Sequence, residues 1–340
     1  FKQKTAYEIS LGLVGSEMCI RDRDISALFS GSSSDYERVC NQIVDVLSEE
    51  CGFVAIGHPA MVEQHQRAND LVRFFDLSHD VKLSMATTQF EPNNSNCYRG
   101  YYPAPEQRGY SDKERLDIGP EPGLVAPNLE GSEILSEPNP WPITEPQAGW
   151  RLDSIQYFDD LRKIAVVLMN SISCGLNLKH DVVDELCRGR NGTLRLLNYL
   201  PQPEQWSNLD SNETPEFVDD KSRWVVGREH VDTTTLTLLW QTYPGLQIKG
   251  RDNEWRDVLP REGGLSVHCG DLFTKLTSGV INGSIHRVLG DGTPRTSVGM
   301  FLEPDWSTII RPPNVDEELS YAEHLLSVFS GRKKAQASRY

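Results

Sequence analysis

Two histidines and one aspartate stand at a spacing that suits a redox-active metal ion. His230 and Asp232 are two residues apart, and His286 follows more than fifty residues later. Ferrous iron uses two histidines and one carboxylate when it must keep coordination positions open for dioxygen and an oxidisable partner. Residues two apart on an extended strand point to the same face, and a neighbouring strand would supply the third ligand. The sequence therefore predicts a metal site formed by His230, Asp232 and His286.

An arginine and a serine follow the second histidine closely. Arg295 and Ser297 lie nine and eleven residues after His286, beyond a tight turn predicted at Gly290-Asp291-Gly292. A hairpin centred on that turn would pair His286 with Ser297 and Val288 with Arg295. In that assumed register Arg295 would lie roughly 7 Å along the sheet from the metal ligand. A guanidinium there could bind the far end of a short dicarboxylate that also reaches the metal.

Further short motifs occur in a consistent order along the chain. They are Asp24-Ile25-Ser26, Cys51-Gly52-Phe53 through His58, Phe74-Phe75-Asp76-Leu77, Arg99-Gly100-Tyr101, Asp117-Ile118-Gly119, Asn139-Pro140-Trp141-Pro142, Gly270-Asp271 and His286-Arg287-Val288. Together with the metal motif they resemble the iron(II)/2-oxoglutarate-dependent dioxygenases of the isopenicillin N synthase-like group. The resemblance extends from about Asp24 to Trp306.

This resemblance implies a fold, a reaction and a set of cofactors. The fold would be mainly β with flanking helices around a double-stranded β-helix, or jelly-roll, core. Fe(2+) would be bound by the three ligands, 2-oxoglutarate by Arg295, Ser297 and Tyr199, and O2 at the remaining iron position. The enzyme would hydroxylate or otherwise oxidise an aliphatic C–H of a small-molecule substrate and release succinate and CO2. Arg99 and Tyr101 fall in the loop that borders the substrate in relatives.

Several alternatives remain open at this stage. An oxidase like isopenicillin N synthase would use the arginine and serine to hold a substrate carboxylate, without 2-oxoglutarate. A non-catalytic binding protein would carry a vestigial site, although the intact ligand set counts against it. Leu197 stands where many members carry a polar residue. His268 is expected to support the site or pack in the core. Tyr101 could instead serve sheet packing, and Arg99 a surface ion pair.

The composition fits one large globular domain. Of the 340 residues, 38% are hydrophobic and 24% are charged. The net charge of -15, from 34 basic and 49 acidic residues, argues against a nucleic acid or an anionic membrane as partner. Seven cysteines without a C-x-x-C motif predict free thiols in a reducing compartment. We therefore expect a cytoplasmic monomer.

The expected organisation is a leader followed by a single domain. Residues 1–23 show no periodicity and no targeting signal, so we expect a non-native or disordered leader. The run from Tyr7 to Arg23 resembles read-through of a sequencing adapter in assembled metagenomic data, and a genuine N-terminal arm is the alternative. Within the domain at 24–340, helices are expected over 35–50, within 60–85 and over 155–175, the jelly-roll core over about 193–306, and a C-terminal helix over about 315–330.

Overall fold

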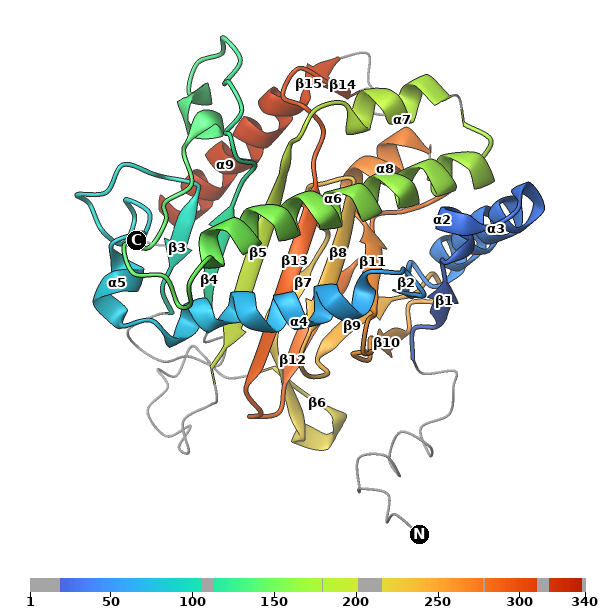
Figure 1. Ribbon diagram of the computed structural model, residues 1–340, viewed down its shortest axis with the longest axis horizontal. Coiled ribbons are helices and arrows are strands. Elements are labelled where there is room, and N and C mark those ends of the chain that lie inside the picture. Colours follow the sequence, from blue (N-terminus) through green and yellow to red (C-terminus); the bar gives the residue numbers. More distant parts are fainter. Residues whose placement is uncertain are drawn as a thin grey trace.

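Two β-sheets lie face to face in the computed structural model (Figure 1), which describes residues 19–104, 113–178, 180–200, 216–277, 279–310 and 318–337. The larger sheet contains eight strands in the spatial order β1 (Asp22–Asp24), β2 (Gly52–Ile56), β11 (Leu265–Cys269), β8 (Leu236–Gln241), β13 (Arg295–Leu302), β5 (Gly192–Tyr199), β4 (Lys113–Ile118) and β3 (Gly100–Tyr102). The smaller contains five, in the order β10 (Trp255–Asp257), β9 (Leu246–Lys249), β12 (His286–Gly290), β7 (Arg223–His230) and β6 (Phe217–Val218). The chain passes repeatedly between the sheets from β7 to β13, as in a double-stranded β-helix.

Helices cover the outer face of the larger sheet. Figure 1 shows α4 (Met61–Leu71) and α6 (Trp150–Gly175) crossing in front of that sheet. The remaining helices are α2 (Ala27–Ser30), α3 (Ser33–Glu49), α5 (His79–Leu83), α7 (His180–Cys187), α8 (Asp271–Leu276) and α9 (Tyr321–Ala337), with 3-10 turns at Val72–Asp76, Ser132–Ser136 and Asp219–Lys221. Within the described residues, no helix is long and apolar enough to cross a membrane.

The C-terminal helix begins later than the sequence indicated. Instead of starting near residue 315, α9 starts at Tyr321, because Leu319–Ser320 forms strand β15 and pairs with β14 (Ile309–Ile310). The Ser320 hydroxyl accepts a hydrogen bond from the Glu323 backbone N–H, and both the Ser320 hydroxyl and its N–H donate to the Glu323 carboxylate. This reciprocal capping satisfies free donors of the first turn and sets the start of the helix.

Strand periodicity divides the larger sheet into two chemically different faces. On β5, Leu194 and Leu196 point outward into the main hydrophobic core, where they join Leu161 and Leu168 of α6. The alternating positions, among them Arg195, therefore face the smaller sheet. We call this the inner face, and it carries the polar side chains of the site.

The predicted hairpin between residues 286 and 297 was wrong. His286 pairs with His230 on β7 and with Ile248 on β9, whereas Ser297 pairs with Leu197 on β5 and Gln241 on β8. The turn after Gly290 connects the two sheets and does not close a hairpin within one of them. Sequence periodicity cannot distinguish these cases, because both require a short turn between two extended segments.

The boundary of the expected leader also differs from position 23. Ile20 is only 4% exposed, and its N–H donates to the carbonyl of Asp257 over 3.0 Å. Strand β1 pairs in parallel with β2, and Arg21 forms an ion pair with Glu50 at 2.9 Å. The segment 19–23 is therefore packed into the fold. Residues 1–18 lie outside the described part of the chain.

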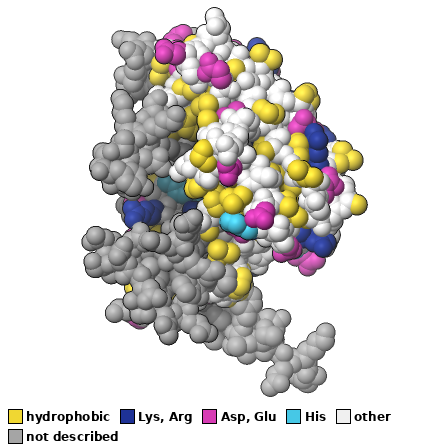
Figure 2. Space-filling view, turned by 90° about the vertical axis from the view of Figure 1, so that its left-hand side faces the viewer, with side chains coloured by type: hydrophobic (Ala, Val, Ile, Leu, Met, Phe, Trp, Pro, Cys, Tyr) yellow, Lys and Arg dark blue, Asp and Glu magenta, His cyan; other side chains and the backbone are white. Residues whose placement is uncertain are grey.

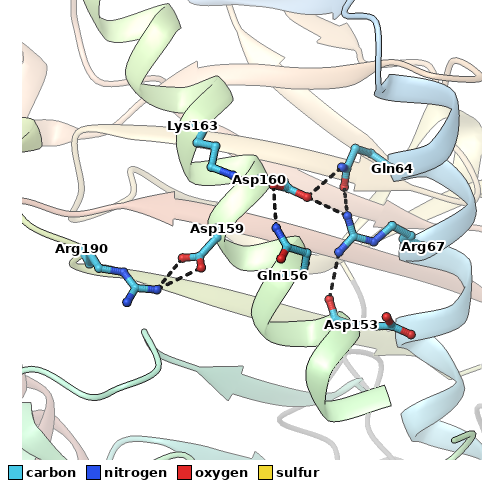
Figure 3. Close-up of polar contacts among 8 residues, drawn as sticks. All are labelled: Gln64, Arg67, Asp153, Gln156, Asp159, Asp160, Lys163 and Arg190. Atoms are coloured by element: carbon cyan, nitrogen blue, oxygen red, sulfur yellow. Dashed lines mark hydrogen bonds and ion pairs between the residues drawn. The ribbon is translucent and has the colours of Figure 1, made fainter. Parts of the chain in front are cut away.

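A polar cluster fastens α4 to α6 (Figure 3). Arg67 on α4 forms an ion pair with Asp160 on α6 at 2.8 Å and also donates to the carbonyl of Asp153. Gln64 reaches the same carboxylate from one turn earlier on α4. Burial alone would raise the pKa of Asp160, but hydrogen bonds from Arg67 and Lys163 hold this pKa below its usual range. The cluster therefore ties the two helices that cover the larger sheet.

We predict that Arg67→Met lowers the free energy of unfolding by about 1–2 kcal/mol, since the partly buried carboxylate of Asp160 loses its charged donor. Because the folded-state pKa of Asp160 is depressed, this contribution is present above the unfolded pKa near ~4 and is lost as the pH falls below it. The difference between wild type and variant should therefore shrink in denaturant titrations at low pH. Arg38→Met, which removes an exposed pair with Asp35, is the control and should change little. An equal effect of both variants at neutral pH would contradict the prediction.

A second prediction concerns the packed segment at the N-terminal end. Two truncated chains, beginning at Cys19 and at Asp24, differ only in that segment. The chain beginning at Asp24 should unfold several degrees lower in a thermal scan, because it loses the buried Ile20 side chain and part of the β1–β2 pairing. Identical melting temperatures would show that the segment contributes nothing.

Candidate metal centre

Strand pairing brings the two histidines together. His230 ends β7 and lies directly opposite His286, the first residue of β12. Asp232 follows two residues after His230, where the chain has left the strand. Its Oδ1 atom lies 3.6 Å from Nε2 of His230 and 3.7 Å from Nε2 of His286. One ligand atom from each of the three residues lies within 4.8 Å of the others, which is close enough for a single ion.

Backbone carbonyls orient both imidazole rings. Nδ1 of His230 lies 2.8 Å from the carbonyl of Arg228, and Nδ1 of His286 lies 3.0 Å from that of Ser284. A carbonyl can only accept, so each Nδ1 carries the proton and each Nε2 presents its lone pair to the site. Burial lowers the pKa of both histidines. Neutral imidazoles aimed at one point are the form that binds a metal ion.

The carboxylate of Asp232 is held by its other oxygen. Oδ2 accepts a hydrogen bond from the Thr237 hydroxyl at 2.7 Å and lies 3.2 Å from Nε2 of His268. Although burial opposes ionisation, the neighbouring histidines keep the pKa of Asp232 well below its usual range. His268 thus lies behind the carboxylate and outside the group of three ligand atoms, where the sequence placed it as a supporting residue.

Arg295 is a buried cation whose hydrogen-bond partners among the described residues are neutral. It is 4% exposed, donates from Nη2 to Gln241 Oε1 at 2.7 Å and from Nε to the Tyr243 carbonyl at 3.1 Å. Its guanidinium lies 4.7 Å from the ring centre of Tyr199. Among the described residues, neither its Nη1 nor the buried Ser297 hydroxyl has a hydrogen-bond partner. Two unused donors at a buried positive charge suit a carboxylate ligand.

One strand connects the metal group to the arginine. On the inner face of β8, Thr237 contacts Asp232 and Gln241 contacts Arg295. Thr237 and Gln241 are four residues apart on the strand, or about 13 Å. The side chains of both residues point toward the smaller sheet. Leu239 lies between them on the same face, and Ser297 faces Gln241 across the β8–β13 pair. Neither Thr237 nor Gln241 was singled out from the sequence, and the available signal was their polar character within the apolar run 236–241.

Arg99 and Tyr101 do not join this group. Tyr101 is 2% exposed, contacts Phe74 in the main core and donates its hydroxyl to Glu114. Strand alternation turns its side chain toward the helices, so the expected substrate contact of Tyr101 was wrong. Arg99 is buried as well and donates to the Thr193 hydroxyl and the Gly192 carbonyl. Its hydrogen bonds are therefore internal to the fold.

Comparison with known proteins agrees with this geometry. Residues 193–304 match the model of the 2OG-Fe(II) oxygenase superfamily. The chain is 28% identical over 328 residues to the 2-oxoglutarate-dependent dioxygenase citB of Monascus ruber, covering 89% of this chain and 92% of the relative. It is 25% identical over 315 residues to isopenicillin N synthase of Streptomyces clavuligerus, covering 89% and 92%.

A solved structure shares the fold across nearly the whole chain. A full-length Neurospora crassa protein in complex with alpha-KG aligns with a TM-score of 0.74 at 21% identity, covering 94% of this chain and 98% of the other. The facing sheets form a double-stranded β-helix core, and the candidate metal ligands point into it. The fold class expected from the sequence is confirmed, and the match of residues 193–304 together with the named relatives agrees with the enzyme class and the family resemblance expected from it.

We predict that Asp232→Ala weakens Fe(II) binding at least tenfold, because it removes the only carboxylate of the group. Metal content after anaerobic dialysis measures the loss, and far-UV circular dichroism checks that the fold persists. Asp252→Ala removes an exposed carboxylate paired with Arg256 and serves as the matched control. Full iron loading of Asp232→Ala would refute the assignment of the site.

Proposed function

We propose that this protein is an Fe(II)/2-oxoglutarate-dependent oxygenase that oxidises an aliphatic C–H of a small-molecule substrate. His230, Asp232 and His286 would hold the iron. The observation that carries the proposal is the buried guanidinium of Arg295, which has no carboxylate partner among the described residues and lies beside the unpaired hydroxyl of Ser297. Names of relatives that use 2-oxoglutarate support the same cosubstrate.

Each side chain has a defined task in this proposal. His230, Asp232 and His286 would hold the iron by one ligand atom each and would leave it able to bind exchangeable ligands. When bound, ferrous iron supplies the activation of dioxygen that is coupled to conversion of 2-oxoglutarate into succinate and CO2. Arg295 and Ser297 would bind the far carboxylate of the cosubstrate, and the ring of Tyr199 keeps the guanidinium plane in place. Leu197 and Leu239 line the inner face between the two ends and limit water there.

An oxidase like isopenicillin N synthase is the second candidate, favoured by the similarity to the Streptomyces clavuligerus enzyme. In that reaction the arginine and serine would hold a carboxylate of the main substrate. The two candidates differ in what the buried guanidinium binds, so the identity of that ligand separates them. A vestigial, non-catalytic site is disfavoured by the intact and well-supported ligand group.

The remaining expectations concern partners and environment. All seven cysteines are free, and Cys40, Cys51 and Cys269 are buried, which supports a reducing, cytoplasmic compartment. The net charge of -15 supports a small molecule over nucleic acid as the partner. We keep a monomer as the proposed state, and sedimentation velocity tests it.

We predict that Arg295→Leu raises the KM for 2-oxoglutarate well over tenfold, since a carboxylate in a partly dry pocket loses its charged partner at a cost of about 2–5 kcal/mol. Iron affinity should barely change, because Arg295 is not a ligand. Anaerobic titration of the iron-loaded protein with 2-oxoglutarate should produce a weak visible charge-transfer band that fades in Arg295→Leu. Arg151→Leu removes an arginine that lies over Trp141 far from the site and is the control. If wild type shows no band and consumes oxygen independently of 2-oxoglutarate, the oxidase is correct.

A further inference from the structure

The inner face of the larger sheet carries basic side chains next to the metal group. Arg115 on β4 lies opposite Leu197, and Arg195 on β5 lies opposite Asp117. Arg115 and Arg195 are 30% and 26% exposed, whereas their strand neighbours on the outer face are buried. The inner face is therefore partly accessible at these positions. Figure 2 shows histidine and basic side-chain surface close together on one side of the molecule.

Strand register and side-chain contacts place this surface at the metal end of the site. The guanidinium of Arg195 lies 5.0 Å from the ring centre of Phe301. Phe301 in turn faces Thr237, the residue that holds Asp232. A molecule in contact with these side chains would thus lie beside the three metal ligands.

The buried carboxylate of Asp117 interacts more closely with Arg195 than with Arg115. Arg195 donates to both oxygens of Asp117, at 2.7 and 2.9 Å. Arg115 approaches the same carboxylate only to 3.6 Å, which is beyond a hydrogen bond, and its guanidinium lies 3.8 Å from the ring centre of Tyr102. Arg195 therefore binds Asp117 by two hydrogen bonds, whereas Arg115 forms only a longer ion pair with it and retains donors that can bind another anion.

The local charges do not cancel. Among the residues that the structure describes, and apart from Asp232 of the metal group, the cations on or against this part of the inner face outnumber the carboxylates by four to two. The cations are Lys113, Arg99, Arg115 and Arg195, and the carboxylates are Asp117 and Glu303. The cosubstrate does not need this excess. In the proposed function, the iron with its single carboxylate ligand carries one positive charge, and Arg295 supplies the second that neutralises a dicarboxylate. The positive charge at Arg115 is thus available to bind the substrate that is oxidised.

We propose that the substrate is a small amphipathic anion whose carboxylate or phosphate binds Arg115 and whose apolar body packs against Leu197 and Phe301. This inference rests on the proposed function and names the substrate class for that site. Leu197 and Phe301 are partly buried apolar side chains of the inner face near Arg115 and Arg195. Stacking on Tyr102 holds the guanidinium group of Arg115 in place, so little side-chain freedom is lost when an anion binds.

Calorimetric titration of the anaerobic protein with Fe(II) and 2-oxoglutarate tests this assignment directly. The probes are phenylacetate, phenyl phosphate and the neutral phenylacetamide, which share one apolar body. At least one of the two anions should bind tenfold or more tightly than the amide, and the stronger one tells whether a carboxylate or a phosphate is preferred. Arg115→Gln should remove this preference, and Arg115→Lys should restore part of it, while amide binding stays unchanged.

The controls separate the substrate class from the cosubstrate. Arg287→Gln removes an arginine stacked on Trp255 at 4.2 Å in the smaller sheet and should leave anion binding unchanged. The visible band of bound 2-oxoglutarate, recorded on the same samples, should persist in Arg115→Gln. Equal binding of acids and amide, no binding of any probe, or an unaltered anion preference in Arg115→Gln would overturn the assignment. If the wild type shows no visible band but still prefers the anions over the amide, only the use of 2-oxoglutarate is refuted.

Discussion

The antiparallel pairing of β7 with β12 is the interaction on which the site depends. It sets His230 directly opposite His286, so that two ligands far apart in the chain have a fixed separation before any metal binds. The carbonyls of Arg228 and Ser284 then select one ring nitrogen of each histidine as the ligand atom. Backbone groups, which cannot change their hydrogen-bonding character, thus determine the protonation pattern of the site.

The larger sheet supplies the side chains that surround the group formed by His230, Asp232 and His286. Its inner face presents Thr237 to Asp232, Gln241 to Arg295, and Arg115 to the open side. Its outer face carries the apolar side chains that pack under α6. A single alternating pattern therefore builds the hydrophobic core and the polar site at the same time. A register slip of one residue in β5 or β8 would exchange the two sets.

Charge is distributed so that each part of the site lacks a counter-charge, a cation at Asp232 and an anion at Arg295 and at Arg115. Asp232 is surrounded by histidines, Arg295 by neutral acceptors, and Arg115 by a carboxylate already bound to Arg195. Folding alone leaves these charges only partly compensated, which is costly in a low-dielectric interior. Ligands that carry the missing charges, a divalent metal ion and two organic anions, would recover that cost upon binding.

The types and spacing of residues by themselves predicted the candidate metal ligands and the arginine–serine pair, because two histidines and a carboxylate followed closely by such a pair form a combination that few other arrangements share. Helix periodicity likewise placed the helices that became α3 and α6. The hairpin register, the packing of Ile20 and the outward side chain of Tyr101 were decided by tertiary structure. Local sequence describes which residues alternate, but only the pairing partner of a strand decides which sheet it joins and which face meets the metal. For the same reason the inner-face role of Arg115 became apparent only when β4 was seen to pair with β5.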